Sequence, residues 1–328
     1  MTLGRRLEYT ALKPNQKSLI ALLVSLALWG TAFPALKIAL RTNSTATVMV
    51  VRYGFSFVLV LAYFLSRHRH EFRALKAMWP LALIGVYNFA GSYLQFAGIA
   101  RTTATKSAVL TNIMIVAVPI LAYWVLDERM DRNKWIAVVL SVVGALMLTT
   151  NLQFRGLLSR GTLVGDLLVT AATVFWALFI VFTRKYTRQY RGFWLLLVNQ
   201  AVTFCLSVPL APTAFVRADR FGLLAGLYLA VFCTVIPTAL YNFSLKRVDA
   251  TTSTILGPVE TLVAALIGIV FFAETLRPFE LVGTGLILAT LIPLSLPRRG
   301  QVEEPALTDC AYTDSGDSPC PGNRSANP

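Results

Sequence analysis

The chain has 328 residues, of which 56% are hydrophobic and 14% are charged. A soluble domain carries about a quarter of its residues as Asp, Glu, Lys or Arg, so this composition excludes an ordinary soluble protein. The formal net charge of +14 does not indicate a nucleic-acid partner, because Lys and Arg lie at the ends of apolar runs and form no basic face. The sequence predicts an all-α polytopic membrane protein that has the lipid bilayer as its surroundings.

Apolar runs near the length that a helix needs to cross hydrocarbon recur along the chain. We predict ten transmembrane helices, at residues 18–40, 46–66, 79–99, 105–126, 134–151, 163–184, 192–210, 221–245, 250–272 and 279–296. An even number of spans places both termini on one side of the membrane. About twice as many Lys and Arg residues lie near that side as near the other, so the positive-inside rule predicts a multi-pass inner-membrane protein with both termini in the cytoplasm.

The two ends of the chain differ from the apolar middle. Residues 1–17 form a basic cytoplasmic segment, and the apolar run that follows is long enough to span and lacks a small-residue cleavage site, so we predict that it is retained. Residues 297–328 are rich in Pro, Asp, Ser, Gly and Asn, which predicts a disordered cytoplasmic tail.

Motifs for catalysis, metals and cofactors are missing from the sequence. The four cysteines form no C-x-x-C pair, and the two histidines, His68 and His70, lie in a basic loop, so we expect no metal site. Phosphate-binding, zinc-protease and nucleophile-elbow motifs are also missing, so we expect neither a cofactor nor an enzyme.

An internal repeat is the most informative feature of the chain. Residues 94–128 align with residues 240–274, and in both stretches Ala-Thr-x-Ser opens one helix and a Glu closes it. The matched pairs include Arg101/Arg247, Ala104/Ala250, Thr105/Thr251 and Glu128/Glu274, and Trp29 pairs with Trp176 in the first helix of each half. We therefore predict one repeat at residues 18–151 and a second at 163–296. Because each holds five helices, an odd number, the halves are expected to be inverted, as in many secondary transporters.

Glu260 is the principal candidate for chemistry, because it lies about ten residues into the ninth span. A charged group at that depth costs about 2.5 to 3.5 kcal/mol on insertion scales and needs a partner. It could couple transport to an ion by binding a proton or a cationic group, or it could be a structural acid bonded to a neighbouring helix. Gly257 and Pro258 precede it and can bend the helix or free its carbonyls. Arg52, a turn inside the second span, could pair with an acidic substrate or act in gating.

Polar side chains form two stripes in corresponding spans of the two halves. Asn88, Ser92 and Gln95 share one face of the third span, and Thr234, Thr238 and Asn242 share one face of the eighth. Such stripes either form hydrogen bonds between helices or line a wet cavity. The predicted cavity residues are Trp29, Asn88, Ser92, Gln95, Asn112, Trp176, Thr238, Tyr241, Asn242 and Glu260.

Several short motifs, in this order and spacing, resemble the drug/metabolite transporter superfamily and its EamA-type carriers. The matching pieces are Ala27-Leu-Trp29-Gly30, Arg52-Tyr, Ala104-Thr-x-Ser-Ala, Asp127-Glu128-Arg, Gly165-Asp166, Phe175-Trp176-Ala and Ala273-Glu274. The resemblance covers about residues 18–296. It implies ten helices in two inverted halves, a cavity lined mainly by spans one, three, four, six, eight and nine, and efflux of metabolites or amino acids. The family often has Glu-Pro in span nine, whereas this chain has Glu260-Thr261 with its proline earlier, at Pro258.

We therefore expect a secondary transporter of small organic solutes that works by alternating access. An exchanger of phosphorylated sugars or nucleotide-sugars is an alternative, but it would need several cations facing the cavity, and the candidates are Lys37, Arg52 and Lys106. A non-transporting scaffold or complex subunit is an alternative from another class. The substrate, the coupling ion and the oligomeric state stay open at the level of sequence.

Overall fold

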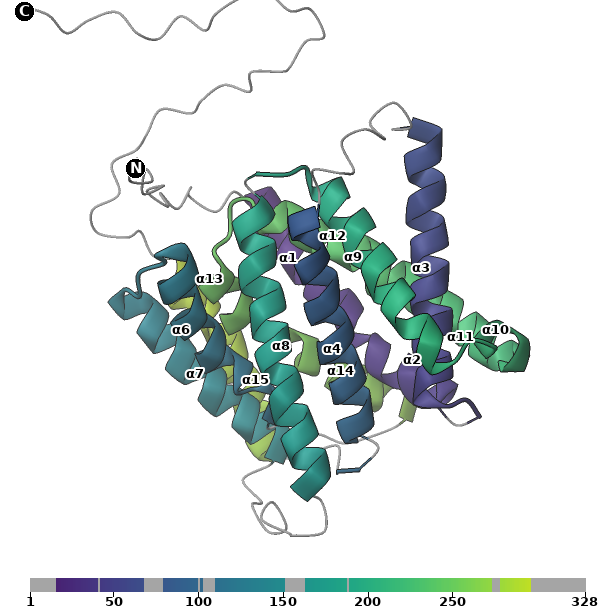
Figure 1. Cartoon of the computed structure of the whole chain (residues 1–328). Coiled ribbons are helices and arrows are strands. Elements are labelled where there is room, and N and C mark those ends of the chain that lie inside the picture. The colour runs from purple at the N-terminus through teal and green to yellow at the C-terminus, as the bar shows by residue number, and fades with distance from the viewer. Residues whose placement is uncertain are drawn as a thin grey trace, which may run out of the picture. The chain divides into compact units, whose positions relative to one another are not determined.

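The computed structural model describes residues 16–40, 42–67, 79–99, 101–102, 110–150, 163–187, 189–272 and 278–295 (Figure 1). Within these ranges the chain is helical and contains no strand. The predicted N-terminal segment up to residue 15, His68, His70, Lys106 and the predicted tail lie outside the described residues.

The described helices lie in both halves of the chain. In the first half they are α1 (Gln16–Gly30), α2 (Ala32–Ala39), α3 (Thr45–Arg67), α4 (Ala82–Ile99), α6 (Met114–Leu126) and α7 (Arg132–Thr150). In the second half they are α8 (Leu163–Thr187), α9 (Gly192–Ser207), η3 (Val208–Leu210), α10 (Ala214–Arg217), α11 (Arg220–Ala230), η4 (Val231–Val235), α12 (Ile236–Ser244), α13 (Ala250–Ile255), α14 (Val259–Phe272), α15 (Pro278–Ala289) and α16 (Leu291–Ser295).

Each predicted span contains helix, and the prediction of a multi-pass helical membrane protein is confirmed. Among the described residues, five helical stretches are long and apolar enough to cross a membrane: Thr45–Arg67, Leu163–Thr187, Gly192–Leu210, Arg220–Ser244 and Ala250–Ile267. Three shorter apolar stretches are Gln16–Gly30, Met114–Leu126 and Pro278–Leu294. The count of ten crossings stays a prediction.

Two of the corresponding spans are interrupted at the same place in each half. In span nine the helix breaks between α13 and α14, where Gly257 donates to the Thr254 carbonyl at 2.9 Å and Pro258 supplies no N–H. In span four, which shows no Gly or Pro at that point, a turn at Asn112 and Ile113 precedes α6. At both breaks, short turns replace the regular helical bonds, as in the bonds from Ile113 N–H to the Leu110 carbonyl and from Val259 N–H to the Leu256 carbonyl.

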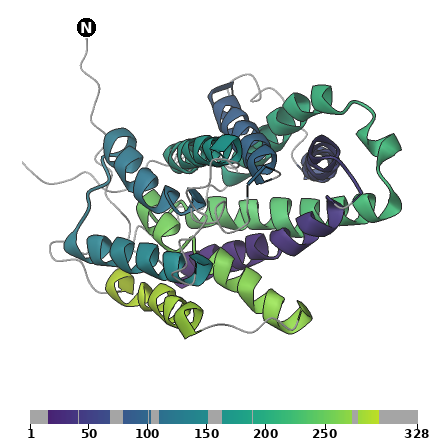
Figure 2. The ribbon, with the colours of Figure 1, turned by 90° about the horizontal axis from the view of Figure 1, so that it is seen from below.

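Packing between the helices follows the internal repeat. The contacts of α1 with α12 and α14 correspond to those of α8 with α4 and α6, and α3 packs on α11 as α9 packs on α4. The remaining large contacts join counterparts directly, α3 with α9, α6 with α13 and α7 with α15. Figure 2 shows α1 and α2 alongside the continuous row of α11 and α12, and α15 alongside α7. The largest contacts between spans therefore keep a counterpart when the two halves are exchanged.

Large apolar side chains also lie on the outer surface of the helices. Trp124 is 76% exposed, Leu224 64% and Ile292 64%. Contiguous apolar surface of this kind is unusual on a soluble monomer. It is explained by lipid, which covers these faces in a membrane.

Candidate functional site

An aromatic pair joins the two halves near the end of α1. The rings of Trp29 in α1 and Tyr241 in α12 have centroids 5.1 Å apart and are tilted by 53°. Tyr241 is buried, and its hydroxyl shares a hydrogen bond with Ser253 Oγ at 3.1 Å. Trp29 is only partly buried, so part of its ring stays available for a further contact.

Arg52 lies against the eighth span rather than at the periphery. Its Nε donates to Thr234 Oγ1 at 2.8 Å and its Nη2 donates to the Cys233 carbonyl at 3.0 Å. Both acceptors lie in η4, a single π-helical turn just before Pro237. Pro237 has no N–H with which to bond the carbonyl four residues earlier, which is that of Cys233. The proline in span eight is the sequence signal that could have predicted this contact.

Glu260 lies in the first turn of α14, directly after the break in span nine. Its carboxylate makes no hydrogen bond or ion pair with any residue that the structure describes, and the side chain is partly exposed. Arg52 is near enough for the two opposite charges to attract each other. A methyl group at Gly30, next to Trp29, would lie 2.6 Å from the Glu260 carbonyl oxygen, so α1 and α14 touch through their backbones here. Trp29, Arg52, Tyr241 and Glu260 are called the Glu260 site below.

Several predicted cavity residues instead bond to neighbouring helices. Asn88 donates to Thr203 Oγ1 at 3.0 Å, and Ser92 shares a hydrogen bond with the Tyr53 hydroxyl at 2.7 Å. Asn242 donates to the Gly192 carbonyl at 3.3 Å. These contacts match the packing role that the sequence had left open for the stripes.

The other candidates have more varied surroundings. Trp176 packs against α4, where a methyl group at Gly91 would lie 3.2 Å from its ring. Thr238 is buried, Gln95 is partly buried, and the buried Nδ2 of Asn112 has no hydrogen-bond partner among the residues that the structure describes. Of the predicted cavity residues, Trp29 and Tyr241 contact each other directly, and Glu260 lies near Trp29 through the close approach of its backbone to Gly30.

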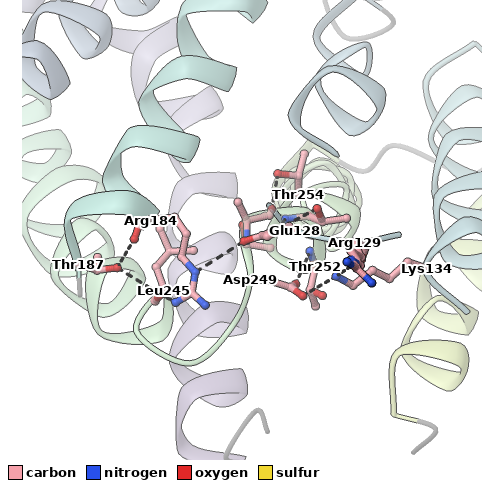
Figure 3. Close-up of polar contacts among 12 residues, drawn as sticks. Glu128, Arg129, Lys134, Arg184, Thr187, Leu245, Asp249, Thr252 and Thr254 are labelled. Atoms are coloured by element: carbon pink, nitrogen blue, oxygen red, sulfur yellow. Dashed lines mark hydrogen bonds and ion pairs between the residues drawn. The ribbon is translucent and has the colours of Figure 1, made fainter. Parts of the chain in front are cut away.

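A second polar cluster, not predicted from the sequence, joins Glu128 just after α6, Lys134 in α7, Arg184 in α8 and Asp249 just before α13 (Figure 3). It contains two ion pairs, Lys134 Nζ to Asp249 Oδ2 at 2.6 Å and Arg184 Nε to Glu128 Oε1 at 3.7 Å. Lys134, Arg184 and Asp249 are 3%, 2% and 4% exposed. Glu128, Lys134, Arg184 and Asp249 are called the Glu128 network below.

Backbone groups complete the Glu128 network. The Glu128 carboxylate accepts hydrogen bonds from the N–H groups of Ala250 and Thr251 at 3.0 and 3.2 Å, and Asp249 accepts from the N–H of Thr252 at 2.9 Å. Arg184 donates to the Leu245 carbonyl. Burial, and next the charge of Asp249, raise the pKa of Glu128 above its usual range, although the Ala250 hydrogen bond and the two cations act in the opposite direction.

Sequence signals for this network existed but did not point to its contacts. The repeat singled out the Glu that closes one helix and the Ala-Thr-x-Ser that opens another, each within its own half. The structure joins the Glu of the first half to the Ala250-Thr251 of the second. The corresponding residues Glu274, Ala104 and Thr105 lie outside the described residues.

A third contact between the halves lies at the start of α3 and α11. Asp219 caps α11 through the Gly222 N–H at 2.7 Å, and it accepts from Asn43 Nδ2 at 2.9 Å and Thr42 Oγ1 at 3.1 Å. The Asn43 hydrogen bond, followed by that of Gly222, lowers the pKa of this exposed carboxyl. This contact has one charge, in contrast to the four of the Glu128 network.

Comparison with known proteins agrees with this arrangement. Residues 16–150 and 163–296 each match the EamA-like transporter family. An uncharacterised transporter of Archaeoglobus fulgidus is 26% identical over 272 residues, which cover 82% of each chain. The uncharacterised inner membrane transporter YedA of Escherichia coli K12 is 24% identical over 300 residues, 88% of this chain and 93% of that protein.

A solved structure supports the fold independently. This crystal structure aligns with the chain at a TM-score of 0.71, and the alignment covers 87% of this chain and 99% of the other. Its 15% sequence identity limits the likeness to the fold. With both halves matched, the chain belongs to the EamA-like transporter family and is a multi-pass membrane transporter, not an enzyme.

Proposed function

We propose that the chain is a secondary transporter that exports amino acids or related small metabolites by alternating access. The observation that carries this proposal is the presence of two opposite charges, Arg52 and Glu260, near each other at the Glu260 site. Arg52 comes from the first half and Glu260 from the second, and Glu260 is without a described hydrogen-bond partner. A cation and an anion on opposite halves, with spare bonding capacity, suit a solute that carries both charges.

The substrate chemistry follows from the groups at the site. An α-carboxylate would bind the Arg52 guanidinium, which has donors beyond the two that Thr234 and Cys233 use. An ammonium group would bind Glu260. The partly buried Trp29 ring, held by Tyr241, would pack against the side chain of the solute.

Glu260 is also our candidate for ion coupling. A carboxylate inside an apolar span is stable when it binds either a proton or a cation, and is costly when it binds neither. If a proton and the ammonium group of the substrate compete for Glu260, the carrier moves one in each direction. Uptake of protons would then drive export of the solute.

The topology is part of the proposal. The repeats at residues 18–151 and 163–296 would be inverted, with both termini in the cytoplasm. Support comes from the excess of Lys and Arg on that side and from the largest helix contacts, which keep a counterpart when the halves are exchanged. Because the chain matches a relative named as an inner membrane transporter, we propose the same membrane for it.

Flux into proteoliposomes tests the proposal. Purified protein is reconstituted, and uptake of labelled amino acids, aromatic metabolites and amines is measured with and without a pH gradient. We expect saturable flux of at least one zwitterionic solute, lost in Glu260→Gln and kept in Asp127→Asn, which removes an exposed carboxylate elsewhere. Absence of flux for every class, or unchanged flux in Glu260→Gln, would overturn it.

A further inference from the structure

The Glu128 network joins the two halves of the chain by buried charges. Glu128 and Lys134 belong to the first half, and Arg184 and Asp249 belong to the second. Each ion pair therefore crosses from one half to the other, as Figure 3 shows for both pairs. Any motion that separates the halves at this end of the molecule must break both of them.

The Glu128 network is connected to the Glu260 site through α13 and α14. Through Ala250 and Thr251, the Glu128 carboxylate holds the first turn of α13. The chain then passes through the break at residues 256–258 into α14, whose first turn carries Glu260. One turn behind the network, Ser253 bonds to Tyr241, which packs on Trp29. Movement of α13 would therefore be transmitted to both sides of the Glu260 site.

Buried charges suit an interface that opens and closes better than one that stays shut. Replacing a buried ion pair by apolar side chains is often neutral or stabilising, so charges are a poor choice for a static seam. When an ion pair separates into water, however, hydration replaces the lost contact, whereas an opened apolar seam exposes apolar surface. Four buried charges across the two halves therefore favour a reversible contact.

We propose that the Glu128 network is a latch that closes the cytoplasmic end of the transport path and breaks once in each cycle. This inference rests on the proposed function and adds to it the residues that control access from one side. The solute or proton at the Glu260 site would bias the latch through α13 and its break. The orientation follows from the proposed cytoplasmic location of the ends of α6, α8 and α12.

A cysteine behind the latch reports its opening. Ser253→Cys changes one atom in a side chain that is 2% exposed and lies beside Tyr241. The native cysteines are replaced by alanine, and a bulky, membrane-impermeant maleimide is added to inside-out vesicles. The labelling rate is measured with the latch intact, in Lys134→Met, and in Lys134→Met combined with Asp249→Asn.

The latch should produce a definite order of labelling rates. Lys134→Met removes the Lys134 cation from the buried Asp249 carboxylate and should label several-fold faster than the intact latch. The double variant removes both charges and should label several-fold slower than the intact latch, because an uncharged seam gains less from hydration. Lys246→Gln, which removes an exposed cation, should leave the rate unchanged.

Two further measurements separate opening of the latch from general loosening or misfolding of the protein. A matched protein that keeps only the buried Cys233 reports general loosening, and its rate should not rise in Lys134→Met. If Lys134→Met does not fold, Arg184→Gln gives the same test through the other ion pair. Equal rates for the intact latch and the double variant, or no labelling in any protein, would overturn the proposal. The labelling assay needs no substrate. Failure of the flux assay would therefore overturn the proposed function, whereas the latch would still be judged by the labelling rates alone.

Discussion

The Glu128 network and the Glu260 site use charge in opposite ways. In the Glu128 network, both cations contact carboxylates, and backbone N–H groups bond to both carboxylates. At the Glu260 site, Arg52 bonds only to neutral oxygens and Glu260 makes no described bond. The Glu128 network therefore uses its charges in contacts between the halves. The charges of the Glu260 site keep bonding capacity for the proposed ligand.

Loss of one charge from the Glu128 network should have the largest effect on stability. Lys134→Met breaks the buried Lys134–Asp249 ion pair and should lower the free energy of unfolding by about 3 to 5 kcal/mol. Thermal unfolding in detergent measures this loss, with Lys246→Gln as the control. A loss below about 1 kcal/mol would mean that the network does not hold the halves together.

Close backbone packing beside the Glu260 site should show the next largest effect. The methyl group of Gly30→Ala would lie 2.6 Å from the Glu260 carbonyl oxygen and 2.9 Å from Val263 Cβ, so α1 and α14 would have to separate. We expect a destabilisation of about 1 to 3 kcal/mol together with loss of flux. Gly285→Ala is the matched control, because a methyl group there meets nothing within 4 Å. If both variants behave alike in thermal unfolding and flux, the close contact has no functional role.

A change of pH should alter the opening of the latch, with a smaller effect than the two substitutions above. The raised pKa of Glu128 in the closed network means that a proton binds the closed form more tightly than an open form in which Glu128 faces water. As the pH rises through the interval between the ordinary and the raised pKa, Glu128 ionises beside Asp249, Lys134 and Arg184, and the opening of the latch becomes easier. Labelling of Ser253→Cys, corrected for the reactivity of free cysteine, should therefore increase with pH. Glu128→Gln should remove this dependence, and a rate that falls with pH would contradict the sign.

The smallest change in stability is expected at Glu260. Glu260→Gln breaks no described hydrogen bond or ion pair, Arg52 keeps its bonds to Thr234 and Cys233, and an intramembrane charge is removed. We expect the free energy of unfolding to change by less than about 1 kcal/mol, or to rise. A loss as large as that of Lys134→Met in the same unfolding assay would make Glu260 a structural acid and erase the contrast between the two regions.

The sequence predicted the helices and the halves better than the contacts between them. Apolar length and the repeat are local patterns, so they located the helical segments, and Gly257 and Pro258 marked a break because proline lacks an N–H. The matching break at Asn112 had no such marker. Lys134 and Arg184 lie near span ends, where the positive-inside rule treats a cation as a sign of orientation. Sequence alone does not show that such a charge is buried against the other half.

The stripes illustrate the same limit. Their spacing places Asn88 and Ser92 on one face of a helix. Their hydrogen-bond partners lie on helices distant in the chain, Thr203 in α9 and Tyr53 in α3. The contact of Arg52 with Thr234 depends on the π-helical turn before Pro237. Such contacts come from tertiary packing, which periodicity does not contain.

The most direct test of the role of Glu260 is a substrate-exchange assay in proteoliposomes. Exchange of a labelled zwitterionic substrate is compared among Glu260→Gln, the parent protein and Asp127→Asn. We predict that Glu260→Gln unfolds at the same temperature as the parent protein but exchanges substrate at least tenfold more slowly, a change that corresponds to about 1.4 kcal/mol. Asp127→Asn should exchange at the parent rate. If folded Glu260→Gln exchanges substrate at the parent rate, the proposed role of Glu260 in binding the substrate is wrong.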